Sequence, residues 1–276
     1  MRGDTPCHRD KIKSSSLALL LTAISIPAIA ECDDRLTALE AALVSSHSDW
    51  TELDAAGRQL VHESGSLHGA ALSIGLKCAD SDFLALVSTL DGARLYDGQT
   101  STGAPILSNS DVRQRRAYLQ ANFHLADTWK LGGRLASNTI WRDMASAGGA
   151  SGYPERYDWT AISLGVQWEK VFDRNRLKLA AWVGRPVRSS MELTLPGRDQ
   201  TILKLGAMRQ TEFTIGWHAP LGLHWYLEAD VQYHRTAIDQ GESSVIQRGG
   251  VPVGLAYQPR TIMVDVPLAI RIGYDF

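Results

Sequence analysis

The chain has 276 residues, with 28 Lys and Arg against 30 Asp and Glu, and 44% of its residues are hydrophobic. A net charge of −2 without a concentrated basic segment argues against a nucleic-acid-binding protein. No Cys, His and carboxylate cluster has a metal-ligand spacing, so we expect neither a metal nor a cofactor.

Residues 1–30 have the three parts of a secretory signal peptide. Basic residues precede an apolar run that begins at Leu17, and Ala28-Ile-Ala30 matches an A-x-A cleavage site. The apolar run is shorter than the about 20 residues that a transmembrane helix needs. We therefore expect this segment to be removed and the rest of the chain to be exported.

Residues 31–53 are expected to form a periplasmic N-terminal segment with a short amphipathic helix, from Asp33 to about Ser46. Three leucines recur at the three- and four-residue spacing of one helix face: Leu36, Leu39 and Leu43. Asp33 or Asp34 could cap the helix. The alternative is that this helix enters the interior of the β-barrel that the rest of the chain predicts and blocks it.

Two cysteines remain after signal removal, Cys32 and Cys78. An even number in an exported protein favours a disulfide, and two unrelated thiols are the alternative. The bond would tether the N-terminal segment below the barrel.

The sequence of residues 54–276 predicts an all-β fold, namely an antiparallel transmembrane β-barrel. Apolar and polar residues alternate over about ten segments, although eight or twelve strands remain possible. The expected strands are 54–63, 68–78, 82–96, 112–125, 128–142, 157–169, 176–187, 205–217, 222–236 and 261–276. The connections between them alternate strictly: short ones at 79–81, 126–127, 170–175 and 218–221, and long polar ones at 97–111, 143–156, 188–204 and 237–260. A short turn at 63–66 is the exception.

The last predicted strand carries the strongest motif. From Ile262 to Phe276 every second residue is apolar or aromatic, and the chain ends on Tyr274-Asp-Phe276. This ending resembles the assembly signal of Gram-negative outer-membrane β-barrels. The resemblance implies an outer-membrane location, recognition by the barrel assembly machinery, and contact with outer-membrane lipid and lipopolysaccharide. It leaves the oligomeric state open.

The inward face of the expected strands is densely charged. Acids and bases occur in similar numbers, and in a narrow barrel they should pair because a lone buried charge is costly. The residues expected in this lumen network are Arg116, Lys130, Arg134, Arg142, Glu169, Glu212, Glu228, Asp230, Asp265 and Arg271. We favour a nearly closed lumen. A narrow ion or solute pore is the alternative.

Enzymatic motifs are weak, and we expect a protein without catalytic activity. The chain resembles omptin proteases in size and strand number, but it has no Asp-x-His motif, and the nearest substitute is Asp230 with His234. His62-Glu63-Ser64 has the His-x-Ser spacing used by outer-membrane lipid hydrolases. A polar partner is missing at Gly75 and Leu76, where those families would place it. A hydrolase of lipid or peptide is therefore the third hypothesis.

Three segments combine turn residues with aromatic and charged groups in expected extracellular loops: 96–105, 147–159 and 248–260. Their sequences resemble those of proteobacterial outer-membrane proteins. They could form a ligand-binding surface or ordered caps over the lumen. The leading hypothesis is a barrel whose extracellular loops bind a ligand or stabilise the membrane.

Overall fold

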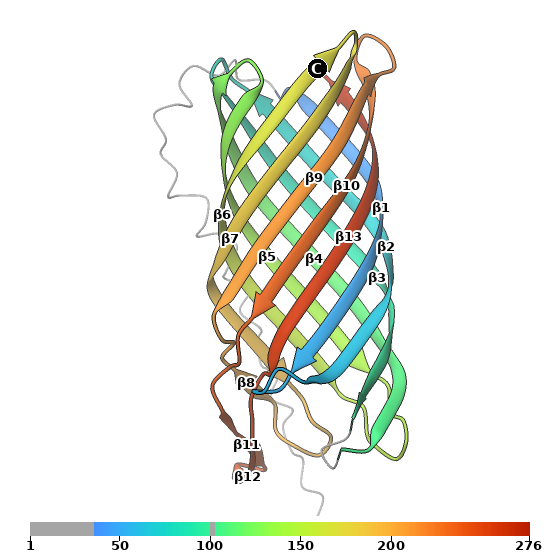
Figure 1. The fold of residues 1–276 in the computed structure, drawn as a ribbon, viewed down its shortest axis with the longest axis vertical. Helices are drawn as coiled ribbons and strands as arrows, with labels where there is room; N and C mark the ends of the chain where they lie inside the picture. The colour runs from blue at the N-terminus through green and yellow to red at the C-terminus, as the bar shows by residue number, and fades with distance from the viewer. Residues whose placement is uncertain (1–35, 100–102) are drawn as a thin grey trace, which may run out of the picture.

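The computed structural model of the chain describes residues 36–99 and 103–276, and ten long strands in this part form a closed barrel (Figure 1). These strands are β1 (Ala38–Leu53), β2 (Gln59–Lys77), β3 (Ser81–Gln99), β4 (Pro105–Ala126), β5 (Trp129–Met144), β6 (Pro154–Phe172), β7 (Asn175–Leu193), β9 (Met208–Pro220), β10 (Trp225–Ile238) and β13 (Arg260–Asp275). Each pairs with two antiparallel neighbours. The short strands β8 (Thr201–Leu203), β11 (Ser244–Arg248) and β12 (Val251–Ala256) lie in the connections at one end.

Two pairings close the ring. Strand β1 pairs with β13 over its full length, from Ala38 opposite Asp275 to Leu53 opposite Arg260. Strand β6 pairs with β7, which continues through β9 and β10 to β13. The barrel therefore has no open sheet edge, as a structure surrounded by lipid requires.

The two ends of the barrel differ as expected for an outer-membrane protein. Short connections at 78–80, 127–128, 173–174 and 221–224 lie at the end with the C-terminus, drawn at the top of Figure 1. Longer connections at 145–153, 194–207 and 239–259 lie at the opposite end. In bacterial barrels the short turns face the periplasm and the long loops face outside. We therefore refer to these as the periplasmic and extracellular ends.

Exposed apolar side chains form a belt around the half of the barrel nearest the periplasmic end. It includes Leu39, Leu43, Leu72, Ile74, Leu119, Phe123, Trp129, Leu131, Ile162, Leu164, Val183, Phe213, Ile215, Trp217, Trp225, Leu227, Val231, Ile270 and Ile272. From Trp225 to Tyr233 it spans roughly 20 Å at the usual strand rise and tilt, close to the apolar band of known barrels. The belt marks the membrane-spanning segments. Outward positions beyond it are mostly polar, so the extracellular part of the barrel stands clear of the membrane.

The expected N-terminal helix is wrong for residues 38–46, which belong to β1. Leu39 and Leu43 are four residues apart, a spacing that fits both a helix face and a strand face, and the alanines between them favoured helix in isolation. Pairing with both β2 and β13 decides for strand. Residues 33–35 and the signal segment 1–30 lie outside the described residues. In the described part of the chain, no helix is long and apolar enough to cross a membrane.

The expected strands 54–63 and 68–78 are one strand, β2, and the expected turn at 63–66 is wrong. Gly65 and Gly69 are needed for close strand approach, because a Cβ there would collide with the carbonyl oxygens of Ala93 and Thr89. The loop expected at 97–111 is also mostly strand, since β3 reaches Gln99 and β4 begins at Pro105. Adding β1 and merging two strands leaves the count at ten.

Candidate functional site

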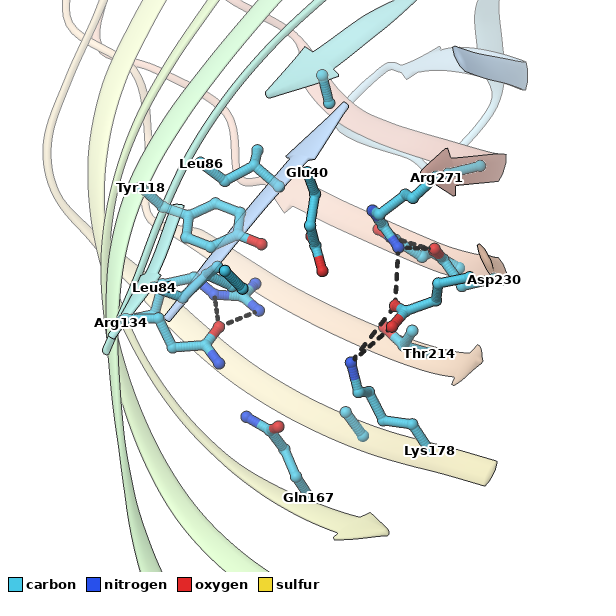
Figure 2. Close-up of a pocket in the computed structure, with 18 of the residues that line it drawn as sticks. Glu40, Leu84, Leu86, Tyr118, Arg134, Gln167, Lys178, Thr214, Asp230 and Arg271 are labelled. Carbon is cyan, nitrogen blue, oxygen red and sulfur yellow. Dashed lines mark hydrogen bonds and ion pairs between the residues drawn. The ribbon is translucent and has the colours of Figure 1, made fainter. Parts of the chain in front are cut away.

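The periplasmic half of the barrel encloses a cavity of about 280 Å³ lined mainly by polar side chains (Figure 2). Strand alternation places these residues inside, because the belt residues between them point to lipid. Glu40 from β1 enters the cavity opposite Lys178, Asp230 and Arg271, while Arg134 and Tyr118 enter from the far wall. The lining also includes Lys77, Phe83 and Asp275 at the periplasmic rim, so the cavity lies toward that end.

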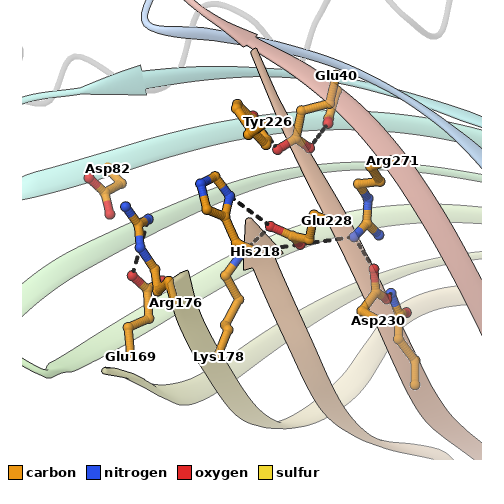
Figure 3. A network of polar contacts seen from close by, with 12 residues as sticks. Glu40, Asp82, Glu169, Arg176, Lys178, His218, Tyr226, Glu228, Asp230 and Arg271 are labelled. Atoms are coloured by element: carbon orange, nitrogen blue, oxygen red, sulfur yellow. Dashed lines mark hydrogen bonds and ion pairs between the residues drawn. The ribbon is translucent and has the colours of Figure 1, made fainter. Parts of the chain in front are cut away.

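One charged network joins β7, β10 and β13 (Figure 3). Glu228 accepts from Lys178, with Nζ 3.3 Å from Oε2, and from Arg271, with Nη1 3.0 Å from Oε1. Arg271 also binds Asp230. Tyr226, on the same strand as Glu228 and Asp230, donates its hydroxyl to Glu40 on β1 at 2.7 Å. Opposite charges on neighbouring strands thus offset the cost of burial.

A second network crosses the lumen, from Glu212 on β9 to Arg116 on β4 and Arg134 on β5. Glu212 accepts from Arg116 at 2.7 Å and from Arg134 at 2.9 Å. The Arg134 guanidinium lies 4.1 Å from the centre of the Trp182 ring, a cation–π contact that holds both side chains in place. At the periplasmic end of the cavity, Nζ of Lys130 lies 2.6 Å from Asp82 Oδ2 and 3.4 Å from Glu169 Oε2, so it bridges the two carboxylates.

Toward the extracellular end, a second, smaller cavity of about 90 Å³ is bordered by Ile140, Trp159 and Met263, and packed side chains then fill the lumen. Buried side chains from all around the ring form one apolar cluster: Trp50, Leu67, Leu90, Val112, Ile140, Tyr157, Trp159, Ala161, Met191, Leu193, Leu203, Leu205, Met208, Ile238 and Met263. Trp50 and Tyr157 meet at its centre with ring centroids 5.0 Å apart, and neither has any exposed surface. We call this cluster the plug.

A buried charge layer lies beside the plug, around Arg142. Its guanidinium is 2.7 Å from Glu63, 3.0 Å from Glu52 and 2.6 Å from Glu155, and it stacks on the Trp50 ring at 4.9 Å. These groups lie well beyond the belt on their own strands. Burial raises the pKa of the Glu155 carboxyl to about 7, although the Arg142 charge opposes the shift. The layer ties β1, β2, β5 and β6 together inside the barrel.

The residues expected in the lumen network divide between these sites. All except Arg142 line the cavity: Arg116, Lys130, Arg134, Glu169, Glu212, Glu228, Asp230, Asp265 and Arg271. Arg142 lies in the buried layer. Sequence reasoning missed its partners Glu52 and Glu63, since Glu52 falls in the predicted periplasmic segment 31–53 and Glu63 at the junction of the predicted strand 54–63 with the turn at 63–66. Correct alternation through β1 and β2 would have placed both inside.

Asp230 and His234 share one lumen face, but they are not in direct contact. Gln232 lies between them, donating to Asp230 at 2.6 Å and contacting His234 Nε2 at 2.8 Å. Asp230 is engaged by Arg271, and His234 lies 3.4 Å from Glu212. Each group therefore has its own structural partner.

His62 and Ser64 point outward on β2, toward the surroundings of the barrel. Ser64 Oγ lies 3.5 Å from Nε2 of His47 on β1, and Asp49 Oδ2 lies 3.2 Å from the same nitrogen. A Ser-His-Asp relay needs the serine and the carboxylate on different ring nitrogens. His62 instead has Nδ1 3.4 Å from the Thr51 hydroxyl. In this conformation the group is a polar cluster and does not form a relay.

The C-terminal residues lie in an aromatic group at the periplasmic end. The ring of Tyr274 is 5.0 Å from both Phe276 and Trp225, and the Phe276 amide donates to Thr37 at 3.2 Å. Cys78 follows β2 at the same end. Cys32 lies outside the described residues, so the disulfide stays a prediction. Among residues 36–99 and 103–276, no cluster of His, Cys, Asp and Glu could hold a metal ion.

The extracellular end carries a hairpin with an exposed apolar surface, formed by β11 and β12. Its exposed residues are Val245, Val251, Val253 and Leu255. The turn is fixed by Asp199, whose carboxylate accepts from the Gly249 and Gly250 amides at 3.0 and 2.8 Å. These hydrogen bonds lower the Asp199 pKa. Both turn glycines have positive φ, which other residues rarely adopt.

No family model and no curated protein sequence matches the chain. Solved structures do. The outer-membrane protease OmpT from Escherichia coli matches with a TM-score of 0.56 and 10% identity, covering 89% of this chain and 98% of that chain. The translocator domain of autotransporter NalP from Neisseria meningitidis has a TM-score of 0.45 and 11% identity, covering 90% and 92%. OprG from Pseudomonas aeruginosa has a TM-score of 0.37 and 13% identity, covering 86% and 95%. The likeness to OmpT and the apolar belt together show that this chain has the fold of a Gram-negative outer-membrane β-barrel.

Proposed function

We propose that this protein is a sealed, non-conducting barrel of the outer membrane that acts through its extracellular surface. The plug is the observation that carries the proposal: buried side chains fill the lumen between the cavity and the outside. A conducting path would have to displace Trp50, Tyr157 and the Arg142 layer, all fully or almost fully buried. Removal of residues 1–30, assembly through the Tyr274–Phe276 signal, and lipopolysaccharide as a neighbour belong to the same proposal.

The β11–β12 hairpin is the candidate ligand-binding surface. Exposed apolar patches at a fixed geometry commonly mark protein interfaces. Asp199 holds the turn in place, so the surface is preorganised and little ordering entropy is lost on binding. We therefore expect a protein ligand with a complementary apolar surface.

Planar bilayer recording tests the seal. The refolded mature protein should give no discrete current steps. The double variant Trp50→Ala, Tyr157→Ala should open a path and conduct, while Trp225→Ala, on the lipid-facing side, should remain silent. Steady steps from the wild type would instead support the narrow pore.

Peptide selection tests the hairpin. A displayed peptide library is selected on the barrel in nanodiscs and counter-selected on a Val253→Ser, Leu255→Ser variant, whose hairpin keeps the Asp199 contacts. Sequences enriched on the wild type alone would support the proposal. Equal enrichment on both proteins would contradict it.

A hydrolase is the second candidate, favoured only by the contact between Ser64 and His47. Rotation of the His47 ring could place Asp49 and Ser64 on different nitrogens. If so, the wild type should hydrolyse lipid esters or peptide bonds, and Ser64→Ala should abolish turnover while Ser66→Ala retains it. Absence of turnover by the wild type removes this candidate.

A further inference from the structure

A row of arginines faces outward just beyond the apolar belt. On three strands the arginine is the first outward residue after the belt: Arg115 follows Ala117, Arg185 follows Val183, and Arg235 follows Tyr233. The full row, which we call the arginine row, is Arg115 on β4, Arg185 and Arg188 on β7, Arg209 on β9 and Arg235 on β10. Alternation fixes their direction, because the adjacent Arg116, Gly184 and His234 line the interior.

These five side chains carry uncompensated charge. Among residues 36–99 and 103–276, none of them has an ion-pair partner, whereas Arg113 and Arg156 nearby pair with Asp91 and Asp158. Arg115 lies 5.0 Å from the centre of the Trp141 ring. Four of the five are exposed and Arg235 is half-buried. The lumen charges, by contrast, are nearly balanced.

The arginine row is unevenly distributed around the barrel, and four of its five members lie on the three adjacent strands β7, β9 and β10. On β1, β2 and β3, the outward residues just beyond the belt are neutral, acidic or histidine: Ser45, His47, Asp49, Ser66, His68 and Asp91. Basic residues that merely border a membrane would be spread around the whole circumference. Concentration in the sector formed by β7, β9 and β10 indicates a ligand on that side.

The chemistry of the row selects phosphate. A guanidinium forms paired hydrogen bonds with phosphate oxygens and is less strongly hydrated than an ammonium group. The belt directly below, with Val183, Ile215 and Val231, suits acyl chains. We propose that this sector binds a phosphorylated glycolipid of the outer leaflet, with its phosphates on the arginine row and its acyl chains on the belt. The inference rests on the membrane placement in the proposed function.

Native mass spectrometry of the refolded mature protein in detergent tests the site. Bisphosphorylated lipid A should bind roughly tenfold more tightly than lipid A whose phosphates have been removed, and the difference should shrink as salt increases. Arg185→Gln, Arg188→Gln, Arg235→Gln should lose this preference. The matched control Arg58→Gln, Arg174→Gln, Arg198→Gln removes the same charge from exposed connections and should keep the preference.

The outcomes separate the alternatives. Equal binding of both lipids by the wild type overturns the inference without need of any variant, so a variant that fails to fold does not block the test. Equal loss in the control would show a general charge effect and would also overturn it. If inorganic phosphate displaces lipid A when both are at the same concentration, the site binds free anions and not a lipid, and the inference is overturned. If the barrel gives no current in planar bilayers and binds both forms of lipid A equally, only this inference is contradicted. If it conducts and still prefers the phosphorylated lipid A, only the proposed function is contradicted.

Discussion

Replacing Arg142 by Met should remove the charge that holds the extracellular half of the barrel together. Its side chain is 1% exposed and contacts Glu52, Glu63 and Glu155, whose side chains are 11%, 0% and 6% exposed. Methionine keeps much of the volume, so the change isolates the charge. Three carboxylates then remain inside with Arg94 as their nearest guanidinium, itself 3.7 Å from Glu63.

The expected cost follows from the burial of these groups. Removing one partner of a buried ion pair typically destabilises by about 3–5 kcal/mol, because the remaining charge is left uncompensated. Three acceptors share Arg142, so we expect the upper part of that range. An exposed pair gives a matched comparison: Arg113 and Asp91 are 55% and 51% exposed, and Arg113→Met should cost about 1 kcal/mol or less.

Urea unfolding of the refolded proteins measures both free energies. Tryptophan fluorescence reports the transition, and heat-dependent gel mobility reports closure of the barrel. The reasoning is refuted if Arg142→Met and Arg113→Met lower the free energy of unfolding equally, since the buried layer would then contribute no more than a surface pair.

Three further predictions follow from other sites. The Glu155 pKa is raised from 4.5 to about 7, so the contribution of this carboxyl to the free energy of unfolding should fall as pH rises from about 5 to 7 and level off above. In urea titrations, Glu155→Gln should remove that fall. An unchanged pH profile of the variant would contradict the prediction. Gly165→Val should destabilise by about 1–3 kcal/mol because a side chain there collides with the Trp182 ring, and Trp182→Leu should restore part of the loss, whereas additive losses would speak against the clash. Mass spectrometry without reductant should show Cys32 joined to Cys78, and alkylation of both thiols would exclude the bond.

Alternation along single strands carried most of what the sequence could predict. Strands β5, β10 and β13 have an apolar and a polar face over their periplasmic halves, and the predicted strands lie within a few residues of the observed bounds. The inward residues of these strands, such as Arg134, Glu228 and Arg271, were placed on the lumen side for the same reason. This two-residue alternation can be recognised within one strand, without knowing which strands pair with it.

The failures depend on partners distant in sequence. Residues 38–46 favour helix locally, and pairing with β2 and β13 makes them a strand. Gly65 suggests a turn until the Ala93 carbonyl on the next strand is in place. The plug, the Arg142 layer and the pinning of the β11–β12 turn by Asp199 also join segments far apart, so no local pattern could reveal them.

The pairing of β1 with β13 makes closure of the ring depend on the last strand of the chain. The ring cannot close before the final strand is delivered, so every earlier intermediate presents the bare hydrogen-bonding groups of β1 to its surroundings. Contacts of such wide sequence separation also form slowly. Until the two seam strands meet, the backbone groups along that edge of β1 need hydrogen-bond partners other than β13.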